Sequence, residues 1–276
     1  MLLAARLVAG IARRPALGRE HIVAVAMATG AGSVGLAAAA ANLAGAGHAW
    51  GRLAIQLLVW GFLLPVFVTV AHRMLPFFTG AVLRGYRGTQ PLWALRLLLA
   101  GSALHGTLAF LELPQWTWLG DLPAAIAATR LSWVWRDPRV LTQPMLAVLH
   151  VAFAWLGPAF ALHAAQSILW QWTPALFGQA PLHALALGFF SSMLIGMVSR
   201  VTLGHSGQPV AADFVMLTAF SAMQLAALLR LAAESPASLG GIVLWLSTLA
   251  WLAGFGLWAA RYGPFIWQAR AHDGRG

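Results

Sequence analysis

Cysteine, lysine and acidic residues are what this sequence has least of. Its 276 residues include no cysteine and no lysine, and only 9% of them are charged, against about a quarter in ordinary soluble domains. The absence of cysteine excludes disulfides, thiolate ligands and Cys-based zinc or iron–sulfur sites. Any metal ion must therefore be held by histidine, methionine, carboxylate or backbone groups. With only seven acidic residues, histidine is the main reservoir of ligands.

Apolar residues are correspondingly abundant and make up 60% of the chain. Apolar stretches of 18 or more residues recur along it, and such stretches are typical of transmembrane helices. We predict an all-α fold, a polytopic transmembrane helix bundle of about eight spans in a lipid bilayer, forming one domain over residues 1–276. The spans are predicted near residues 22–43, 53–70, 92–113, 120–135, 145–168, 182–201, 214–231 and 240–260.

The positive charge lies mainly between these spans. All 17 basic residues are arginine, and most lie before the first span, after the last one, or in the second, fourth and sixth loops. Basic residues favour the cytoplasmic side of a membrane, so we predict that both termini are cytoplasmic. The net charge of +10 does not indicate nucleic acid, because no basic run interleaves with aromatic residues as a single-strand groove requires.

Histidine is the ionisable residue that recurs at membrane depth, where such side chains are functional candidates. We predict an outer layer of His105, His163 and His183 and an inner layer of His72, His150 and His205. Neutral imidazole binds haem iron and copper. Each of the six is therefore either a metal ligand or an imidazole hydrogen-bonded to a neighbouring helix. The other three histidines, His21, His48 and His272, are expected at solvated boundaries.

Arginine and small residues at membrane depth complete the candidate set. Arg130 is the charge expected to be most buried, and it either reaches the inner interface or, like Arg73 or Arg200, holds a haem propionate. Carboxylates are predicted only at the membrane edges, with Asp121 at the outer one, which counts against a proton-coupled carrier. A stripe of small residues in the sixth span predicts close packing of helices.

Two segments of the chain resemble the signature of the NnrS family of haem- and copper-containing membrane proteins. The first contains His183, Gly188, Gly196, Met197, Arg200, Gly204, His205 and Gly207, with Ser206 where the family usually has threonine. The second is Arg73-Met-Leu-Pro76-Phe77-Phe78-Thr79, similar to the family's Arg-x-x-Pro-Phe-Phe-Thr after an earlier helix. His150, following Leu149, also falls where the family tends to have Leu-His.

The resemblance implies a haem and copper protein of the bacterial inner membrane, tied to nitric oxide response or denitrification, with nitric oxide as a small ligand. Among the six histidines, it favours His150, His183 and His205 as ligands. Family members usually carry further N-terminal helices with a His-x-His-Glu-Met-type segment, which has no match here. We therefore expect a chain that begins late, with Met1–Ile11 as the end of an incomplete helix.

Two alternatives stay open beside this interpretation. The first is a metal-free carrier or channel for a small solute, which the Gly- and Ala-rich helices suit. The second is a catalytic subunit resembling the haem–copper oxidases, although the chain has no His-His pair of the kind that such a copper centre often uses. No catalytic constellation stands out, so the sequence does not predict an enzymatic activity.

Overall fold

The computed structural model describes residues 16–170, 172–173, 177–234 and 240–268. Within these ranges the chain is helical apart from short connections, and no strand is present. The prediction of an all-α membrane bundle is confirmed. The expectations for Met1–Ile11 and His272 lie outside the described residues.

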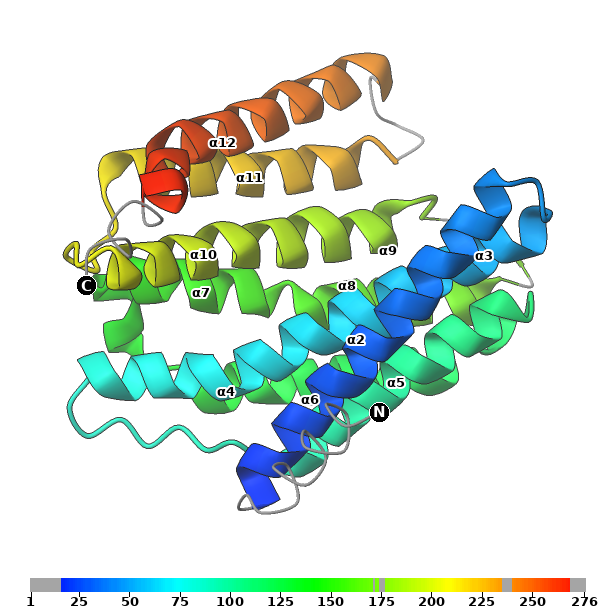
Figure 1. Cartoon of the computed structure of the whole chain (residues 1–276), viewed down its shortest axis with the longest axis horizontal. Helices are drawn as coiled ribbons and strands as arrows, with labels where there is room; N and C mark the ends of the chain where they lie inside the picture. Colours follow the sequence, from blue (N-terminus) through cyan, green and yellow to red (C-terminus); the bar gives the residue numbers. More distant parts are fainter. Residues whose placement is uncertain (1–15, 171, 174–176, 235–239, 269–276) are drawn as a thin grey trace.

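Eight helical passes make up the described part of the chain (Figure 1). They are α2 (Ala16–Leu43), α3–η1–α4 (His48–Gln56, Leu57–Leu63, Leu64–Val82), α5 (Leu92–Phe110), α6 (Trp118–Trp135), α7–α8 (Pro144–Ala154, Leu156–Leu169), α9–η4–α10 (Ala180–His183, Ala184–Ser191, Ser192–His205), α11 (Phe214–Ala232) and α12 (Gly240–Gln268). Short 3₁₀ turns, η2 (Pro114–Trp116) and η3 (Pro138–Thr142), lie in two connections. Seven of the passes are long and apolar enough to cross a membrane, and α6 is the exception.

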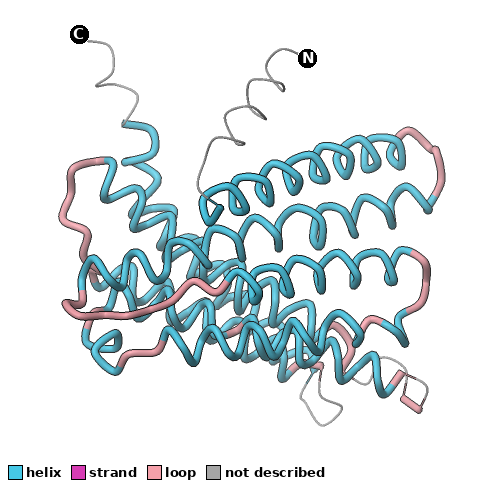
Figure 2. The backbone as a smooth tube through the Cα atoms, turned by 90° about the horizontal axis from the view of Figure 1, so that it is seen from below, coloured by secondary structure: helices cyan, strands magenta, loops and turns pink. Residues whose placement is uncertain are grey.

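The passes lie side by side with their connections at two ends of the bundle (Figure 2). At one edge α11 and α12 form an antiparallel hairpin that packs on α10, and α10 packs on α7. At the other edge α2 crosses η1 and α4 (Figure 1). Between these edges α6 packs against both α5 and α8. Because the number of passes is even, α2 begins and α12 ends at the same end of the bundle.

The second pass continues as a helix to Val82, beyond the span end expected at residue 70. Arg73 and the Pro76–Thr79 segment therefore lie inside α4, where the sequence placed them after the helix. One face of this extension is buried against the bundle, including His72, Leu75, Pro76 and Thr79. Burial of that face explains why the helix continues past the length that the apolar run alone indicates.

Two passes contain a widened, π-helical stretch. One is η1, which places Trp60 in the core, and the other is η4, which contains Gly188. Such stretches occur often at functional sites. At Gly188 the helix packs so closely on the indole of Trp155 that no side chain fits between them.

The small-residue stripe of the sixth pass meets neighbouring helices, as the sequence predicts. Gly196 packs against Leu149 of α7. Ser192 accepts a hydrogen bond from Gln224 Nε2 of α11 at 2.6 Å, and Ser199 accepts one from the indole of Trp258 of α12 at 2.9 Å. The stripe thus serves helix packing. Met193 is buried in the core and Met197 packs against it.

Candidate metal centre

The hairpin of α5 and α6 brings a histidine and an aspartate together inside the bundle. Gly101 and Gly120 are the points of closest approach: a Cβ atom added to Gly101 would lie 2.7 Å from the carbonyl oxygen of Gly120. His105 lies one turn beyond Gly101, and Asp121 directly follows Gly120. Close contact of the two backbones therefore places both side chains at one level.

His105 and Asp121 form a buried hydrogen-bonded pair. Nδ1 of His105 lies 2.8 Å from Oδ1 and 2.9 Å from Oδ2 of Asp121. The carboxylate is 0% exposed and His105 is 7% exposed. Since a carboxylate oxygen accepts, Nδ1–H donates, and the free nitrogen of the ring is Nε2. A carboxylate that orients an imidazole in this way is typical of the surroundings of metal-ligating histidines.

A second histidine and a tryptophan complete this group. The ring of Trp60 stacks on His105 with 3.6 Å between centroids. His163, from α8, packs edge-on against His105 at 4.8 Å and against Trp60 at 5.1 Å. Nε2 of His163 is buried and has no hydrogen-bond partner. We call Trp60, His105, Asp121 and His163 the outer cluster.

The third histidine predicted for the outer layer lies apart from this cluster. His183 is half-buried at the start of its pass, and its Nδ1 donates to the carbonyl oxygen of Gln179 at 2.7 Å. Arg230 and Glu234, which form an ion pair at 2.6 Å, lie in its electrostatic surroundings. Among the contacts of the described residues, none joins His183 to His105 or His163.

In the inner layer, His72 meets His21 of α2. Nδ1 of His72 lies 3.0 Å from Nε2 of His21, and Nε2 of His72 lies 3.2 Å from the carbonyl oxygen of Pro91. Because the carbonyl only accepts, His72 donates to it and receives the bond from His21. Both nitrogens of His72 are therefore engaged. The expectation of a solvated His21 is wrong: it is 4% exposed, because α2 packs across α4.

His150 lies on the wall of a cavity between α6, η3 and α7. Thr79 donates to the carbonyl oxygen of Leu75 at 2.8 Å and lies 2.9 Å from Nε2 of His150. Thr79 therefore accepts from His150, and Nδ1 of His150 is left available. The cavity measures about 510 Å³ and is also lined by Arg136, Asp137 and Phe153, a volume within the range of about 300–1,000 Å³ for small-molecule sites.

The remaining predicted site residues lie at the surface or near it. Arg200 lies over the ring of Phe78 at 4.1 Å, and Arg73 is exposed beside a groove that it shares with His21. His205 is exposed at the end of α10. The expectation that Arg130 is the most buried charge is wrong: it is exposed on α6, because it lies on the side of that helix turned away from α5 and α8.

Some residues of the family motifs are buried, others are exposed, and one terminates a helix. Pro76 and Thr79 are buried in α4, whereas Phe77 is 62% exposed. Gly204 is exposed near the end of α10. Gly207 has a φ of +69°, a conformation that favours glycine. This turn lets the N–H of Gln208 reach the carbonyl oxygen of Leu203 at 3.0 Å and closes the helix end.

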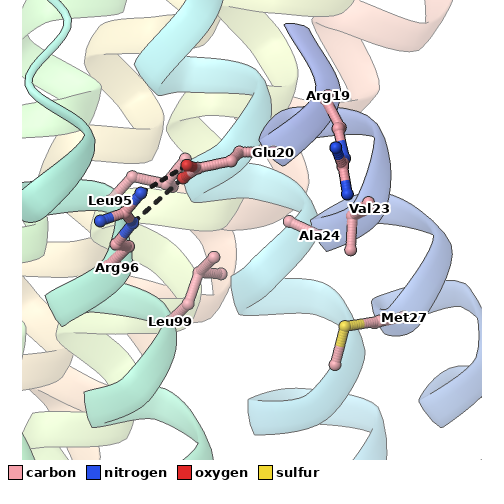
Figure 3. Close-up of a pocket in the computed structure, with 8 residues that line it drawn as sticks. All are labelled: Arg19, Glu20, Val23, Ala24, Met27, Leu95, Arg96 and Leu99. Atoms are coloured by element: carbon pink, nitrogen blue, oxygen red, sulfur yellow. Dashed lines mark hydrogen bonds and ion pairs between the residues drawn. The ribbon is translucent and has the colours of Figure 1, made fainter. Parts of the chain in front are cut away.

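A further cavity, between α2 and α5, contains no histidine. It measures about 530 Å³ and is lined by Arg19, Glu20, Val23, Ala24, Met27, Leu95, Arg96 and Leu99 (Figure 3). Arg96 spans it with two hydrogen bonds to the carboxylate of Glu20. This ion pair joins α2 to α5, and Met27 is the one lining residue with a soft ligand atom.

Outside the spans, Asp213 is an acidic residue with both a backbone and a side-chain partner. It caps α11 by accepting from the N–H of Met216 at 2.8 Å, and it pairs with Arg261 of α12 at 2.6 Å. Partial burial by itself raises the pKa of Asp213, but the Met216 N–H and the Arg261 guanidinium together hold that pKa below its usual value. The pair joins α12 to the loop that precedes α11.

Sequence reasoning missed two members of the outer cluster. Asp121 was expected at the outer edge, but it is fully buried because it lies in the first turn of α6, packed against α5. His105 lies a few residues before the connection between α5 and α6, and Asp121 lies a few residues after it. Residues at similar distances from such a connection lie opposite each other in a helical hairpin. This spacing could have predicted the pair. Trp60 carries no such signal, since the chain has 14 tryptophans.

Apolar helices long enough to cross a membrane, with histidines buried between them, define the class: a polytopic membrane protein with a candidate metal centre. A family model described as NnrS protein matches residues 1–270, nearly the whole chain. The chain therefore belongs to the NnrS family, and the resemblance of its two motifs is confirmed. No curated protein and no solved structure matches the chain.

Proposed function

We propose that this NnrS-family chain is a haem and copper protein of the bacterial inner membrane that acts in nitric oxide response or denitrification. The family match over residues 1–270 carries the proposal. Its physical support is that histidines from different helices are buried in the bundle at two levels, where ionisable groups are functional candidates. A small apolar gas such as nitric oxide can reach such a level through the lipid.

The cavity beside His150 is our candidate for the haem site. It supplies one imidazole with Nδ1 available, an apolar wall that includes Phe153, and the guanidinium of Arg136 at its polar edge. Guanidinium groups suit the planar, bidentate binding of a carboxylate such as a haem propionate. Haem bound there would supply an iron that can bind a diatomic gas.

The protein's own groups would hold and orient such a macrocycle. Thr79 fixes the ring of His150 through the bond to Nε2, and Arg136 is itself held over the ring of Trp133 at 3.2 Å. His183 and His205 lie at the two ends of one pass. Among the described residues, neither packs against another histidine. Each would therefore need a second ligand from another segment in order to bind a metal.

The test is the absorption spectrum of purified protein from cells supplied with haem. We expect a Soret band that shifts when nitric oxide is added without oxygen, and that weakens at least several-fold in His150→Ala. His48→Ala is the control, because His48 is exposed at the start of α3. A folded, haem-supplied wild type with no Soret band refutes the proposal, and solute flux through metal-free proteoliposomes would favour the carrier instead.

A further inference from the structure

The outer cluster has the features of a site for one cation. Two imidazoles from α5 and α8 lie with 4.8 Å between ring centroids. Nε2 of His163 is buried with no partner, and leaving a buried nitrogen unpaired is unfavourable. Such a group in a native structure calls for an explanation, and a bound cation supplies one.

Asp121 prepares His105 for the same task. Both carboxylate oxygens receive Nδ1–H of His105, so the free nitrogen of that ring is Nε2, the more usual metal ligand. Trp60 covers one face of the His105 ring at 3.6 Å and limits its rotation. The two free nitrogens thus belong to rings that are in contact with each other.

Charge and ligand number decide which ion fits. Asp121, 0% exposed, contributes at most one negative charge, so a divalent ion would leave an uncompensated buried charge, whereas a monovalent cation leaves less. Within the described residues, no group of three or more His, Asp or Glu side chains is placed to hold a metal. Zinc usually takes at least three protein ligands, while Cu⁺ accepts two imidazoles.

We propose that the outer cluster binds a single Cu⁺ ion through His105 and His163, with Asp121 as a positioning residue for His105. The inference rests on the proposed function, which it extends by separating the copper site from the haem cavity beside His150. His150 and His163 are 13 residues apart along one pass, about 20 Å of helix, so they cannot bind the same metal ion.

The test is Cu⁺ binding to purified, haem-containing wild type under anaerobic, reducing conditions, in competition with a bidentate Cu⁺ chelator. We expect one Cu⁺ per chain, with two nitrogen ligands in X-ray absorption at the copper edge. His163→Phe should abolish binding. Asp121→Asn should weaken it by about 10–100-fold, as loss of an outer-shell partner typically does. His48→Phe, a change at an exposed histidine, should leave it unchanged.

The Soret band separates this inference from the proposed function. A wild type that has the band but retains no Cu⁺ overturns the copper site alone, and so does folded His163→Phe with wild-type affinity. Zn²⁺ bound as tightly as Cu⁺ overturns the monovalent assignment. If His163→Phe fails to fold, as judged by helical circular dichroism, His163→Gln replaces it, and Cu⁺ affinity in this variant equal to wild type also overturns the site.

Discussion

Replacing Gly101 by alanine tests whether backbone contact between α5 and α6 builds the outer cluster. The added Cβ would lie 2.7 Å from the carbonyl oxygen of Gly120 and 2.9 Å from the Cβ of Ala124, whereas ordinary contact begins at 3.4 Å. One of the two obstacles is backbone, so the helices must separate by about half an ångström or more, and overpacking of this kind costs about 1–3 kcal/mol.

The assay is thermal unfolding in detergent followed by circular dichroism. For a chain of this size, about 1 kcal/mol corresponds to roughly 2–4 °C, so we expect Gly101→Ala to lower the apparent Tm by roughly 2–12 °C. The same separation pulls His105 from Asp121, so Cu⁺ affinity should fall as well.

Gly30→Ala is the matched control, because Gly30 lies in helix α2 with nothing within 4 Å of an added Cβ. Alanine is favoured over glycine inside a helix, so this variant should unfold at the wild-type temperature or slightly above it. Wild-type stability and Cu⁺ affinity in Gly101→Ala would refute the reasoning.

Three further predictions concern other parts of the chain. Because the pKa of Asp213 is lowered in the folded protein, its pair with Arg261 stabilises the fold above the ordinary carboxyl pKa of about 4, and this stability is lost as the pH falls through the lowered value. Asp213→Asn should therefore reduce the loss of stability between about pH 5 and pH 3, by under about 1 kcal/mol since the pair is partly exposed; an unchanged acid limb of the unfolding curve contradicts this. His21→Ala should lower the free energy of unfolding by about 1–3 kcal/mol, because Nδ1 of His72 loses its donor, and urea denaturation with His48→Ala as control measures this. A reporter that fluoresces only in the cytoplasm should fluoresce on either terminus, and fluorescence from one terminus alone contradicts the predicted topology.

The depth of a side chain in the bundle was readable from the sequence, whereas its neighbours were not. Counting residues from the span ends placed His105 and His163 at one level, and the structure brings their rings together. The same count placed His183 with them, yet its contacts are with Gln179 and the surroundings of Arg230. Level along the axis follows from the rise per residue, but direction around the helix does not.

The errors have one physical origin. His21, Asp121 and Arg130 were each placed by distance from a predicted membrane boundary, and each proved to be decided by which face of its helix meets another helix. In a soluble protein an apolar stripe marks that face. In a membrane both the lipid and the core are apolar, so α6 carries no such stripe to show that Asp121 points inward and Arg130 outward.

By itself the sequence determined the class of fold, the approximate position of the spans and the family, because apolar length and ordered motifs are properties of the chain alone. Only the tertiary structure decided that Asp121 holds His105, that Trp60 covers it, and that Nε2 of His163 is buried without a partner. These relations join four separate passes, and their distances depend on how closely Gly101 and Gly120 let two backbones approach.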